Sequence, residues 1–218
     1  MPEASTNPII YLITGGETDA ATTPESEEFV RLVALARAAA GAGVSIVQLR
    51  EKRLRPRVLY ELAARSAAAL TGSATRLLVN DRADIARAAG ADGVHLAAAS
   101  PEVGAVRRAF GEDFLIGVST HTLEEARAAR DGGADFAVFG PVFDTPSKRA
   151  YGTPAGLEKL RAAAHALAPF PILAVGGVAR DNFTAALAAG ARGVAAIRLF
   201  ADADGLSAVV REITGANF

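Results

Sequence analysis

The segment AGADGVHL at residues 89–96, together with three variants of it, decides the fold of this chain. The variants are AGAGVSIVQL at 40–49, GGADFAVFG at 132–140 and AGARGVAAI at 189–197. In each, a glycine follows a helical pattern, and its freedom to adopt a left-handed conformation stops the helix. A short apolar run of strand length comes next. A helix, a tight turn and a strand that recur in this way indicate alternating β and α units.

Working outward from these segments, we count eight units, with strands at 9–13, 44–49, 76–79, 93–96, 114–118, 135–139, 170–174 and 192–197. The runs between them carry apolar residues at three- and four-residue spacing, as in EFVRLVALARAAAG. The strands are apolar on both faces, which is typical of parallel strands covered by helices. Eight units in 218 residues favour a single-domain (β/α)8 TIM barrel, an α/β fold, over residues 1–218. The alternative is an open doubly wound sheet, but no G-x-G-x-x-G follows the first strand.

The composition excludes several classes of protein. Lys plus Arg number 23 against 24 Asp plus Glu, so the net charge of −1 gives no electrostatic footprint for nucleic acid or an anionic membrane. The chain has no cysteine, which excludes disulfide frameworks, thiolate zinc sites and a cysteine nucleophile. The apolar runs are too short to span a membrane, and MPEASTNPII does not resemble a secretory signal. We therefore expect a cytoplasmic protein, and the sequence leaves its oligomeric state open, a homodimer included.

Polar residues collect where the predicted strands end, and in a barrel of this class the chemistry lies at those ends. Gln48, Arg50 and Lys52 alternate after the second strand, so an extended backbone turns all three to one side. Two cations and an amide that converge on the barrel mouth favour a phosphate or diphosphate ligand. The alternative is a solvated strand end with a surface salt bridge through Glu51.

Asn80 and Asp81 follow the third strand. Asp81 is a candidate magnesium ligand, because Mg²⁺ takes carboxylate and phosphate oxygens together. Asn and Asp also cap helices well, so the alternative is that one of them, or Asp84, begins the helix in RADIARAA. Gly176 and Gly177 end the seventh strand, where bare backbone amides can approach a phosphate ahead of a helix, a tight turn being the alternative.

The longest polar loop, GPVFDTPSKR at 140–149, follows the sixth strand. Its Thr145, Ser147 and Lys148 add two hydroxyls and a cation, and the length of the loop favours a mobile lid over a plain surface loop.

The histidines fall in three different settings. His121 lies beside the mouth in a Ser-Thr-His-Thr segment that starts at Ser119, so it is a candidate ligand contact. His95 ends a buried strand and is interpreted as a hydrogen-bonded core residue, and His165 on a peripheral helix is interpreted as structural.

Taken together, the runs QLREK, VNDRADIARAAGADGVHL, GVSTHTLEEA, FGPVFDTPSK and AVGGV resemble the thiamine phosphate synthase family and its sister branch, the thiazole tautomerases. The resemblance covers residues 9 to 212, with the motifs in the expected order. It implies a (β/α)8 barrel that uses Mg²⁺. It also implies a synthase that joins a hydroxymethylpyrimidine diphosphate to a hydroxyethylthiazole phosphate, giving thiamine phosphate and diphosphate.

The resemblance also implies residue roles, with Asp81 as the metal ligand. The residues it places on the pyrimidine diphosphate are Gln48, Arg50, Lys52, Asn80, Ser119 and Lys148. Those it places on the thiazole phosphate are Thr145, Ser147, Gly177 and the backbone near Ile197 and Arg198. Gly176 is added to this set because its backbone amide, like that of Gly177, has no side chain to block a phosphate. The residues expected to act on the reacting groups are Lys148, Ser119 and, by analogy with the tautomerases, His121.

Two departures from the synthase pattern bear on the activity. After GVHL the synthases continue Gly-Gln-x-Asp, whose Asp is a second magnesium ligand, but this chain has Ser100 at that position. Where synthases carry small hydroxyl residues after the eighth strand, this chain reads AAIR at 195–198. The tautomerase branch also lacks Gly-Gln-x-Asp, yet it tends to lose the QLREK and NDR features kept here. We expect a synthase, with a tautomerase as the alternative and a non-catalytic sensor of thiamine-type phosphates as a third hypothesis.

Overall fold

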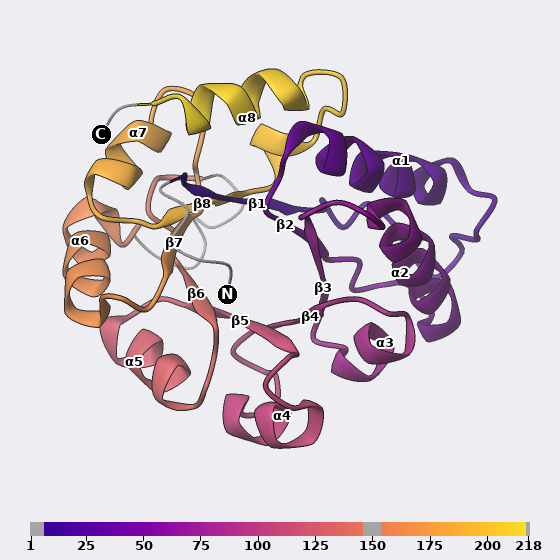
Figure 1. The fold of residues 1–218 in the computed structure, drawn as a ribbon, viewed down its shortest axis with the longest axis horizontal. Helices are drawn as coiled ribbons and strands as arrows, with labels where there is room; N and C mark the ends of the chain where they lie inside the picture. The colour runs from indigo at the N-terminus through magenta and orange to yellow at the C-terminus, as the bar shows by residue number, and fades with distance from the viewer. Residues whose placement is uncertain (1–6, 146–153, 217–218) are drawn as a thin grey trace.

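A computed structural model describes residues 7–145 and 154–216, whose strands close into a parallel barrel surrounded by helices (Figure 1). The strands are β1 (Ile9–Ile13), β2 (Ile46–Leu49), β3 (Arg76–Asn80), β4 (Gly93–Leu96), β5 (Leu115–Thr120), β6 (Phe136–Phe139), β7 (Ile172–Val175) and β8 (Gly193–Ala196). The helices are α1 (Glu27–Ala42), α2 (Pro56–Leu70), α3 (Ala83–Ala88), α4 (Val103–Phe110), α5 (Leu123–Asp131), α6 (Gly156–Leu167), α7 (Phe183–Ala188), the 3-10 turn η2 (Arg198–Phe200) and α8 (Leu206–Thr214). The predicted barrel is confirmed, because β8 pairs with β1 and leaves no open edge.

The core has two layers, one on each face of the sheet. Inward-facing side chains fill the barrel, among them Tyr11, Ile13, Ile46, Leu78, Phe136, Val138, Leu173 and Ala195. Outward-facing residues of the same strands, such as Leu12, Leu77 and Val94, are buried under the helices. Burial on both faces explains why these strands are apolar at nearly every position.

The recurring glycines behave as the repeated segments predict. Gly43, Gly90, Gly133 and Gly190 have φ angles of 80°, 74°, 92° and 94°, in the left-handed region that glycine enters without steric cost. Each one ends a helix within a few residues of the next strand. These turns keep the α1–β2, α3–β4, α5–β6 and α7–β8 connections short.

The strand bounds differ from the predicted ones by two residues or fewer. β2 begins at Ile46 rather than at residue 44, because the Val44 N–H closes the end of α1 by donating to the Ala39 carbonyl at 3.0 Å. β5 extends to Thr120, two residues beyond the predicted end.

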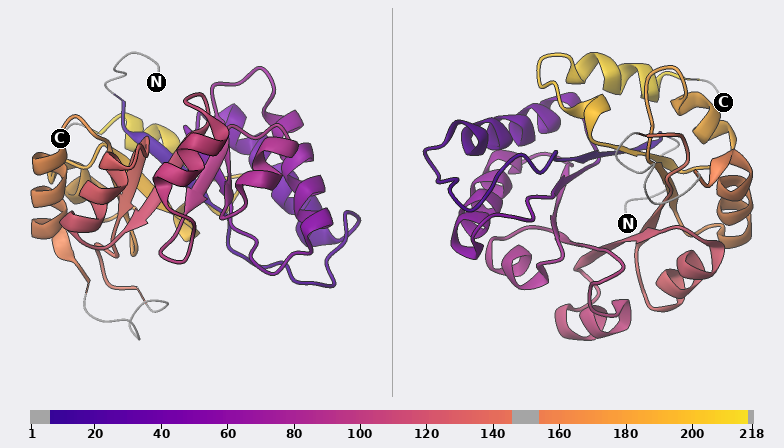
Figure 2. Two further views of the ribbon diagram at one scale, coloured as in Figure 1. Left: turned by 90° about the horizontal axis from the view of Figure 1, so that it is seen from below. Right: turned by 180° about the vertical axis from the view of Figure 1, so that it is seen from behind.

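The connections that follow the strands gather at one end of the barrel, which we call the mouth. The connection between β1 and α1 projects from the edge of the barrel (Figure 2). Among the described helices, none has the length and apolar character that crossing a bilayer requires.

Candidate active site

Three of the predicted site residues form one connected group at the ends of β2 and β3. The Gln48 side chain is 1% exposed, and its Nε2 donates to Oδ1 of Asn80 at 3.0 Å. Nδ2 of Asn80 donates in turn to Oδ2 of Asp81 at 2.6 Å. The helix-cap interpretation of Asn80 and Asp81 is wrong, because the cap position of α3 is held by Arg82, without a side-chain capping bond.

Asp81 is held in an unusual conformation at the mouth. Its φ of 60° lies in the left-handed region, which costs a non-glycine residue about 1 kcal/mol and is concentrated at functional sites. The Asp81 N–H donates to the His95 carbonyl at 2.9 Å, and the Ser100 hydroxyl donates to Oδ1. These contacts fix the carboxylate beside the ends of β3 and β4.

A second polar group crosses the barrel interior from β1 to β5. The Tyr11 hydroxyl lies 2.9 Å from Oε1 of Gln48 and 2.9 Å from Nδ1 of His95. Nε2 of His95 lies 2.9 Å from the Ser119 hydroxyl, which is half-buried at the mouth. Both ring nitrogens of His95 therefore have partners, as expected for a core histidine.

Burial controls the protonation of this group. It lowers the pKa of His95 to about 4, with nearby Asp81 opposing the shift and Arg50 adding to it. Burial also raises the pKa of Tyr11 well above its usual value. At neutral pH the imidazole and the phenol are therefore both uncharged, and they act as hydrogen-bonding groups of fixed position.

Glu51 is 2% exposed, so the surface salt-bridge interpretation of this residue is wrong. Its Oε1 accepts from Thr14 Oγ1 at 2.5 Å and from the Gly16 N–H at 3.2 Å, and its Oε2 accepts from Thr18 Oγ1 at 2.6 Å. Thr14 Oγ1 also accepts the Arg50 N–H at 2.8 Å. Glu51 therefore joins the β1–α1 connection to the segment that carries Arg50.

The two cationic residues predicted to follow β2, Arg50 and Lys52, differ in their placement. Arg50 is half-buried directly after β2, near enough to His95 to affect its pKa. Lys52 is exposed in a turn beyond the strand. β2 ends at Leu49 and Lys52 lies in a turn, so the extended backbone that the alternation argument assumes does not reach Lys52. A role of Arg50 or Lys52 in binding stays a prediction.

Backbone, not side chains, dominates the mouth at the end of β7. Gly176 and Gly177 have φ angles of 88° and 69°. A Cβ on Gly176 would lie 2.5 Å from Pro141 Cβ, and one on Gly177 would lie 2.7 Å from the Asp144 carbonyl oxygen. Asn182 holds this turn by donating to the Gly177 carbonyl at 2.9 Å. Glycine is therefore required at both positions.

The remaining residues predicted for the thiazole phosphate lie nearby or outside the described part of the chain. Val175 pairs with Ala195, which brings the turn at Gly177 beside the end of β8. Ile197 is half-buried there, and Arg198 is exposed in η2. Thr145 is buried after β6. Ser147 and Lys148 lie outside the described residues, as does the part of the predicted lid beyond Thr145.

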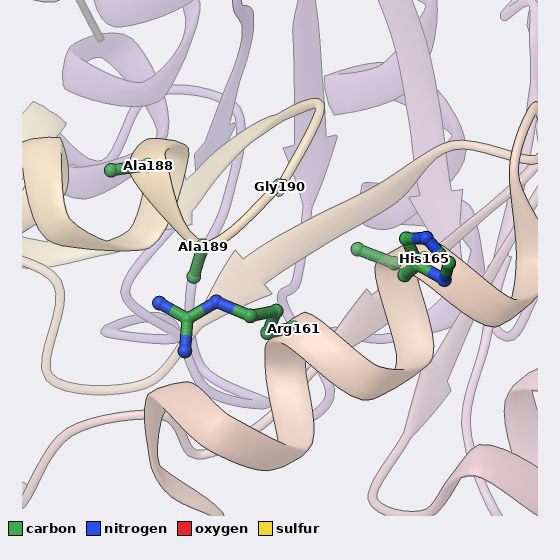
Figure 3. Close-up of a pocket in the computed structure, with 6 residues that line it drawn as sticks. Arg161, His165, Ala188, Ala189 and Gly190 are labelled. Atoms are coloured by element: carbon green, nitrogen blue, oxygen red, sulfur yellow. The ribbon is translucent and has the colours of Figure 1, made fainter.

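The other two histidines, His121 and His165, lie in different parts of the molecule. His121 is exposed in the turn after β5, with Nδ1 against the Gly140 carbonyl, so it lies at the mouth. His165 is exposed on α6, where it lines a surface pocket of about 250 Å³ with Arg161 and Ala189 (Figure 3). This pocket lies on the helical layer, near the loop that leads into β8, and is separate from the mouth.

Four contributors to the site were missed by sequence reasoning: Tyr11, Glu51, Ser100 as a partner of Asp81, and Asn182. Tyr11 carries a readable signal, since it is the one polar-tipped residue in the strand IIYLI. Glu51 and Asn182 act through backbone and loop groups, which no residue pattern displays.

Asp81 is the carboxylate that the sequence predicts as a metal ligand at this mouth. Within the described residues, no group of three His, Cys, Asp or Glu side chains could hold a metal ion. Asp81 with the Ser100 hydroxyl nevertheless offers hard oxygen atoms, and Mg²⁺ commonly uses one or two carboxylates plus substrate phosphate oxygens. The residues present fit Mg²⁺ held jointly by the protein and a phosphorylated ligand.

Comparisons with known proteins agree on one family. Residues 10–200 match the family model described as thiamine monophosphate synthase. A putative thiamine-phosphate synthase of Geobacter sulfurreducens is 48% identical over 174 residues, covering 79% of this chain and 81% of that protein. The thiamine-phosphate synthase of Anaeromyxobacter dehalogenans is 46% identical over 165 residues, covering 76% and 73%.

Solved structures point the same way. Thiamine phosphate pyrophosphorylase of Pyrococcus furiosus superposes with a TM-score of 0.76 at 28% identity, covering 94% of this chain and 96% of that one. A 4-hydroxy-2-oxoglutarate aldolase from TTHB1 superposes with a TM-score of 0.63 at 21% identity and covers 95% and 92%. The aldolase shows a shared barrel fold alone.

Proposed function

The chain belongs to the thiamine monophosphate synthase family, and on that premise we propose that it is a transferase that makes thiamine phosphate. The proposed substrates are hydroxymethylpyrimidine diphosphate and hydroxyethylthiazole phosphate, and the second product is diphosphate. The relatives named thiamine-phosphate synthase support this proposal.

The observation that carries the proposal is the connected group Gln48–Asn80–Asp81 with Arg50 beside it. An amide pair, a carboxylate and a cation at one strand edge suit a diphosphate that shares a divalent cation with the protein. Across the mouth, the glycine turn at Gly177 suits a second phosphate that approaches bare backbone. Two separate phosphate seats match two phosphorylated substrates.

Mg²⁺ is the proposed cofactor, with Asp81 and the Ser100 hydroxyl as its protein ligands. When bound, it would offset the negative charge that develops on the departing diphosphate. Asn80 would hold Asp81 for this role through the hydrogen bond from its Nδ2 to Oδ2 of Asp81.

The protein's own residues chiefly position the two substrates. Arg50 would bind diphosphate oxygens, and Ser119 would contact the pyrimidine ring from the end of β5. The Gly177 turn would hold the thiazole phosphate so that the ring nitrogen faces the reacting carbon. Holding two reactants in reacting geometry can supply about 7–11 kcal/mol of a barrier, which removes the need for a strong base.

The direct test is incubation of the purified chain with both substrates and Mg²⁺, followed by chromatography for thiamine phosphate and an assay for diphosphate. We expect both products in equal amounts and loss of turnover when the metal is chelated. Binding of the thiazole phosphate without release of diphosphate would contradict the proposal and would support the sensor hypothesis.

A tautomerase remains the second candidate, because Ser100 stands where the synthases carry a second carboxylate and His121 is exposed at the mouth. For a tautomerase, the carboxythiazole phosphate would isomerise without the pyrimidine substrate, and His121→Gln would abolish that reaction. For the proposed synthase, His121→Gln should leave thiamine phosphate formation within a few-fold of the unaltered chain.

A further inference from the structure

An unbroken chain of hydrogen bonds runs through the mouth from Ser119 on β5 to Asp81 after β3. Its members, in order, are Ser119, His95, Tyr11, Gln48, Asn80 and Asp81. We call this set the hydrogen-bond chain. The five contacts measure from 2.6 to 3.0 Å, so each is a hydrogen bond with one hydrogen between its two heavy atoms.

The Asp81 end of the hydrogen-bond chain dictates the orientation of both amides. An ionised carboxylate can only accept hydrogen bonds, so Asn80 must present its Nδ2 to Asp81. Oδ1 of Asn80 then faces Gln48, which must present its Nε2. Oε1 of Gln48 is therefore the atom that faces Tyr11.

The same logic continues through the two buried rings. Tyr11 has one hydroxyl hydrogen, which it donates to Oε1 of Gln48, so the contact with His95 must be donated by Nδ1 of the imidazole. A neutral imidazole carries a single ring hydrogen. Nε2 of His95 is then an acceptor, and Ser119 must donate its hydroxyl hydrogen to it. The low pKa of the buried imidazole is consistent with the neutral form that this assignment needs.

We propose that the Asp81 carboxylate sets the direction of the whole hydrogen-bond chain, which holds His95 as the Nδ1–H tautomer and leaves Ser119 only lone pairs to offer a ligand. Tyr11 and His95 are then positioning residues that act through Ser119. Ser119 selects a ligand that carries a hydrogen-bond donor. On the proposed function, from which this last step follows, that donor is the exocyclic amino group of the pyrimidine.

Packing keeps the imidazole in its place. A Cβ on Gly117 would lie 2.9 Å from Nδ1 of His95 and 2.4 Å from Cζ of Phe136, so both rings occupy the space that this glycine leaves open. Tyr11 meets Phe136 edge to face, with ring centroids 5.5 Å apart. The rings therefore have one arrangement, in which the tautomer and not the ring position responds to Asp81.

The test is ¹⁵N–¹H NMR of the full chain labelled at histidine, without any substrate. The chain has three histidines, and His121→Gln and His165→Gln variants assign their signals by elimination. We expect His95 to carry its hydrogen on Nδ1 at neutral pH. A hydrogen on Nε2, or a doubly protonated ring, would overturn the proposal using the unaltered protein alone.

Two variants test which end sets the direction. In Asp81→Asn the new amide can donate as well as accept, so we expect a second population with the hydrogen on Nε2. In Ser119→Ala the acceptor end is unchanged, so His95 should remain Nδ1–H. A tautomer ratio in Asp81→Asn identical to that of the unaltered chain would show that the carboxylate does not set the direction.

A kinetic experiment tests the consequence for the substrate. Tyr11→Phe keeps the ring packing and removes the hydroxyl, which interrupts the hydrogen-bond chain. We expect the KM for the pyrimidine substrate to rise about 10-fold while the KM for the thiazole phosphate is unchanged, and Tyr60→Phe on α2 is the matched control. Equal changes in both KM values would reduce Tyr11 to a structural role. Because the NMR test needs no turnover, failure of the proposed function would leave its result intact.

Discussion

The mouth of the barrel has two halves, one lined mainly by side chains and the other mainly by backbone. At the ends of β1 to β5, side chains dominate, and Gln48, Asn80, Asp81 and Ser119 belong to one connected set of hydrogen bonds. At the ends of β6 to β8, the turn at Gly177 excludes side chains, because a Cβ would meet backbone atoms of the preceding loop. In the β1–β5 half, the polar atoms that face a ligand belong to side chains and can be replaced by mutation. In the β6–β8 half they belong to the backbone, and close packing fixes its conformation.

This difference implies that the two halves of the mouth recognise their ligands through different kinds of interaction. Side-chain amides, a carboxylate and a cation can distinguish donors from acceptors, so the β1–β5 half suits a ligand with a defined pattern of polar atoms. Backbone at a glycine turn recognises the charge and shape of a phosphate, whatever the rest of the ligand is. Mutations in the two halves should therefore affect different substrates, which the following variants test.

The largest effect is expected for Asp81→Ala in the side-chain half. It removes the one carboxylate proposed to hold Mg²⁺, and we expect turnover to fall on the order of 10³-fold, about 4 kcal/mol of barrier. Diphosphate release under saturating substrates measures it. The matched control is Asp84→Ala, since Asp84 lies exposed in the first turn of α3 and is paired with Arg82. If both variants lose activity equally, Asp81 has no special role.

The next effect is expected for Gly177→Ala in the backbone half. The added Cβ would lie 2.7 Å from the Asp144 carbonyl oxygen, so the turn must shift. We expect the KM for the thiazole phosphate to rise on the order of 30-fold, or about 2 kcal/mol, with the pyrimidine KM nearly unchanged.

Gly72→Ala controls for the backbone strain in that experiment. Gly72 also has a positive φ, of 81°, but a Cβ there would meet nothing within 4 Å. Gly72→Ala should lose about 1 kcal/mol of stability in denaturant unfolding from backbone strain alone, and it should leave both KM values unchanged. Gly177→Ala should lose more stability, because its Cβ also meets backbone atoms. A change in the pyrimidine KM of Gly177→Ala would contradict the division of the mouth.

A smaller effect is expected for Glu51→Gln, which belongs to the support of the side-chain half. The Gly16 and Thr18 backbone N–H groups both donate to the carboxylate, and a glutamine must turn its own donor toward one of them. We expect a loss of about 1–3 kcal/mol in the free energy of unfolding and a rise of a few-fold in the pyrimidine KM. Glu27→Gln, on the exposed first turn of α1, should change neither value.

The smallest effect is expected for Ser100→Asp, which sharpens the metal site. A second carboxylate beside Asp81 should tighten Mg²⁺ binding about 10-fold, which is about 1.4 kcal/mol, and without metal it should lower Tm because two like charges face each other. Thermal unfolding with and without Mg²⁺ measures both. A variant whose Tm does not depend on the metal would place the Mg²⁺ site elsewhere.

The residues of the candidate site differ in how far the sequence alone predicts them. Gln48, Asn80, Asp81 and Ser119 were all predicted, because each follows a strand and strand ends meet at one edge of a parallel barrel. Lys52 was predicted on a periodicity that ends with the strand. Tyr11, in mid-strand, could only be placed once the closed barrel brought β1 and β4 across from each other.

The sequence by itself determined the barrel, because short-range signals specify it. Glycines that stop helices, apolar runs of strand length and amphipathic helices all act within a few residues of one another. It also determined which end of the barrel is polar.

Only the tertiary structure decided which polar residues touch. Glu51 became a buried support and not a surface ion-pair partner, since Thr14 and Thr18 reach it from more than thirty residues away along the chain. The direction of hydrogen bonds through Tyr11 and His95 likewise depends on contacts across the barrel. Such contacts depend on strand register and ring packing at the scale of a single bond length, which the pattern of residue types along a chain does not record.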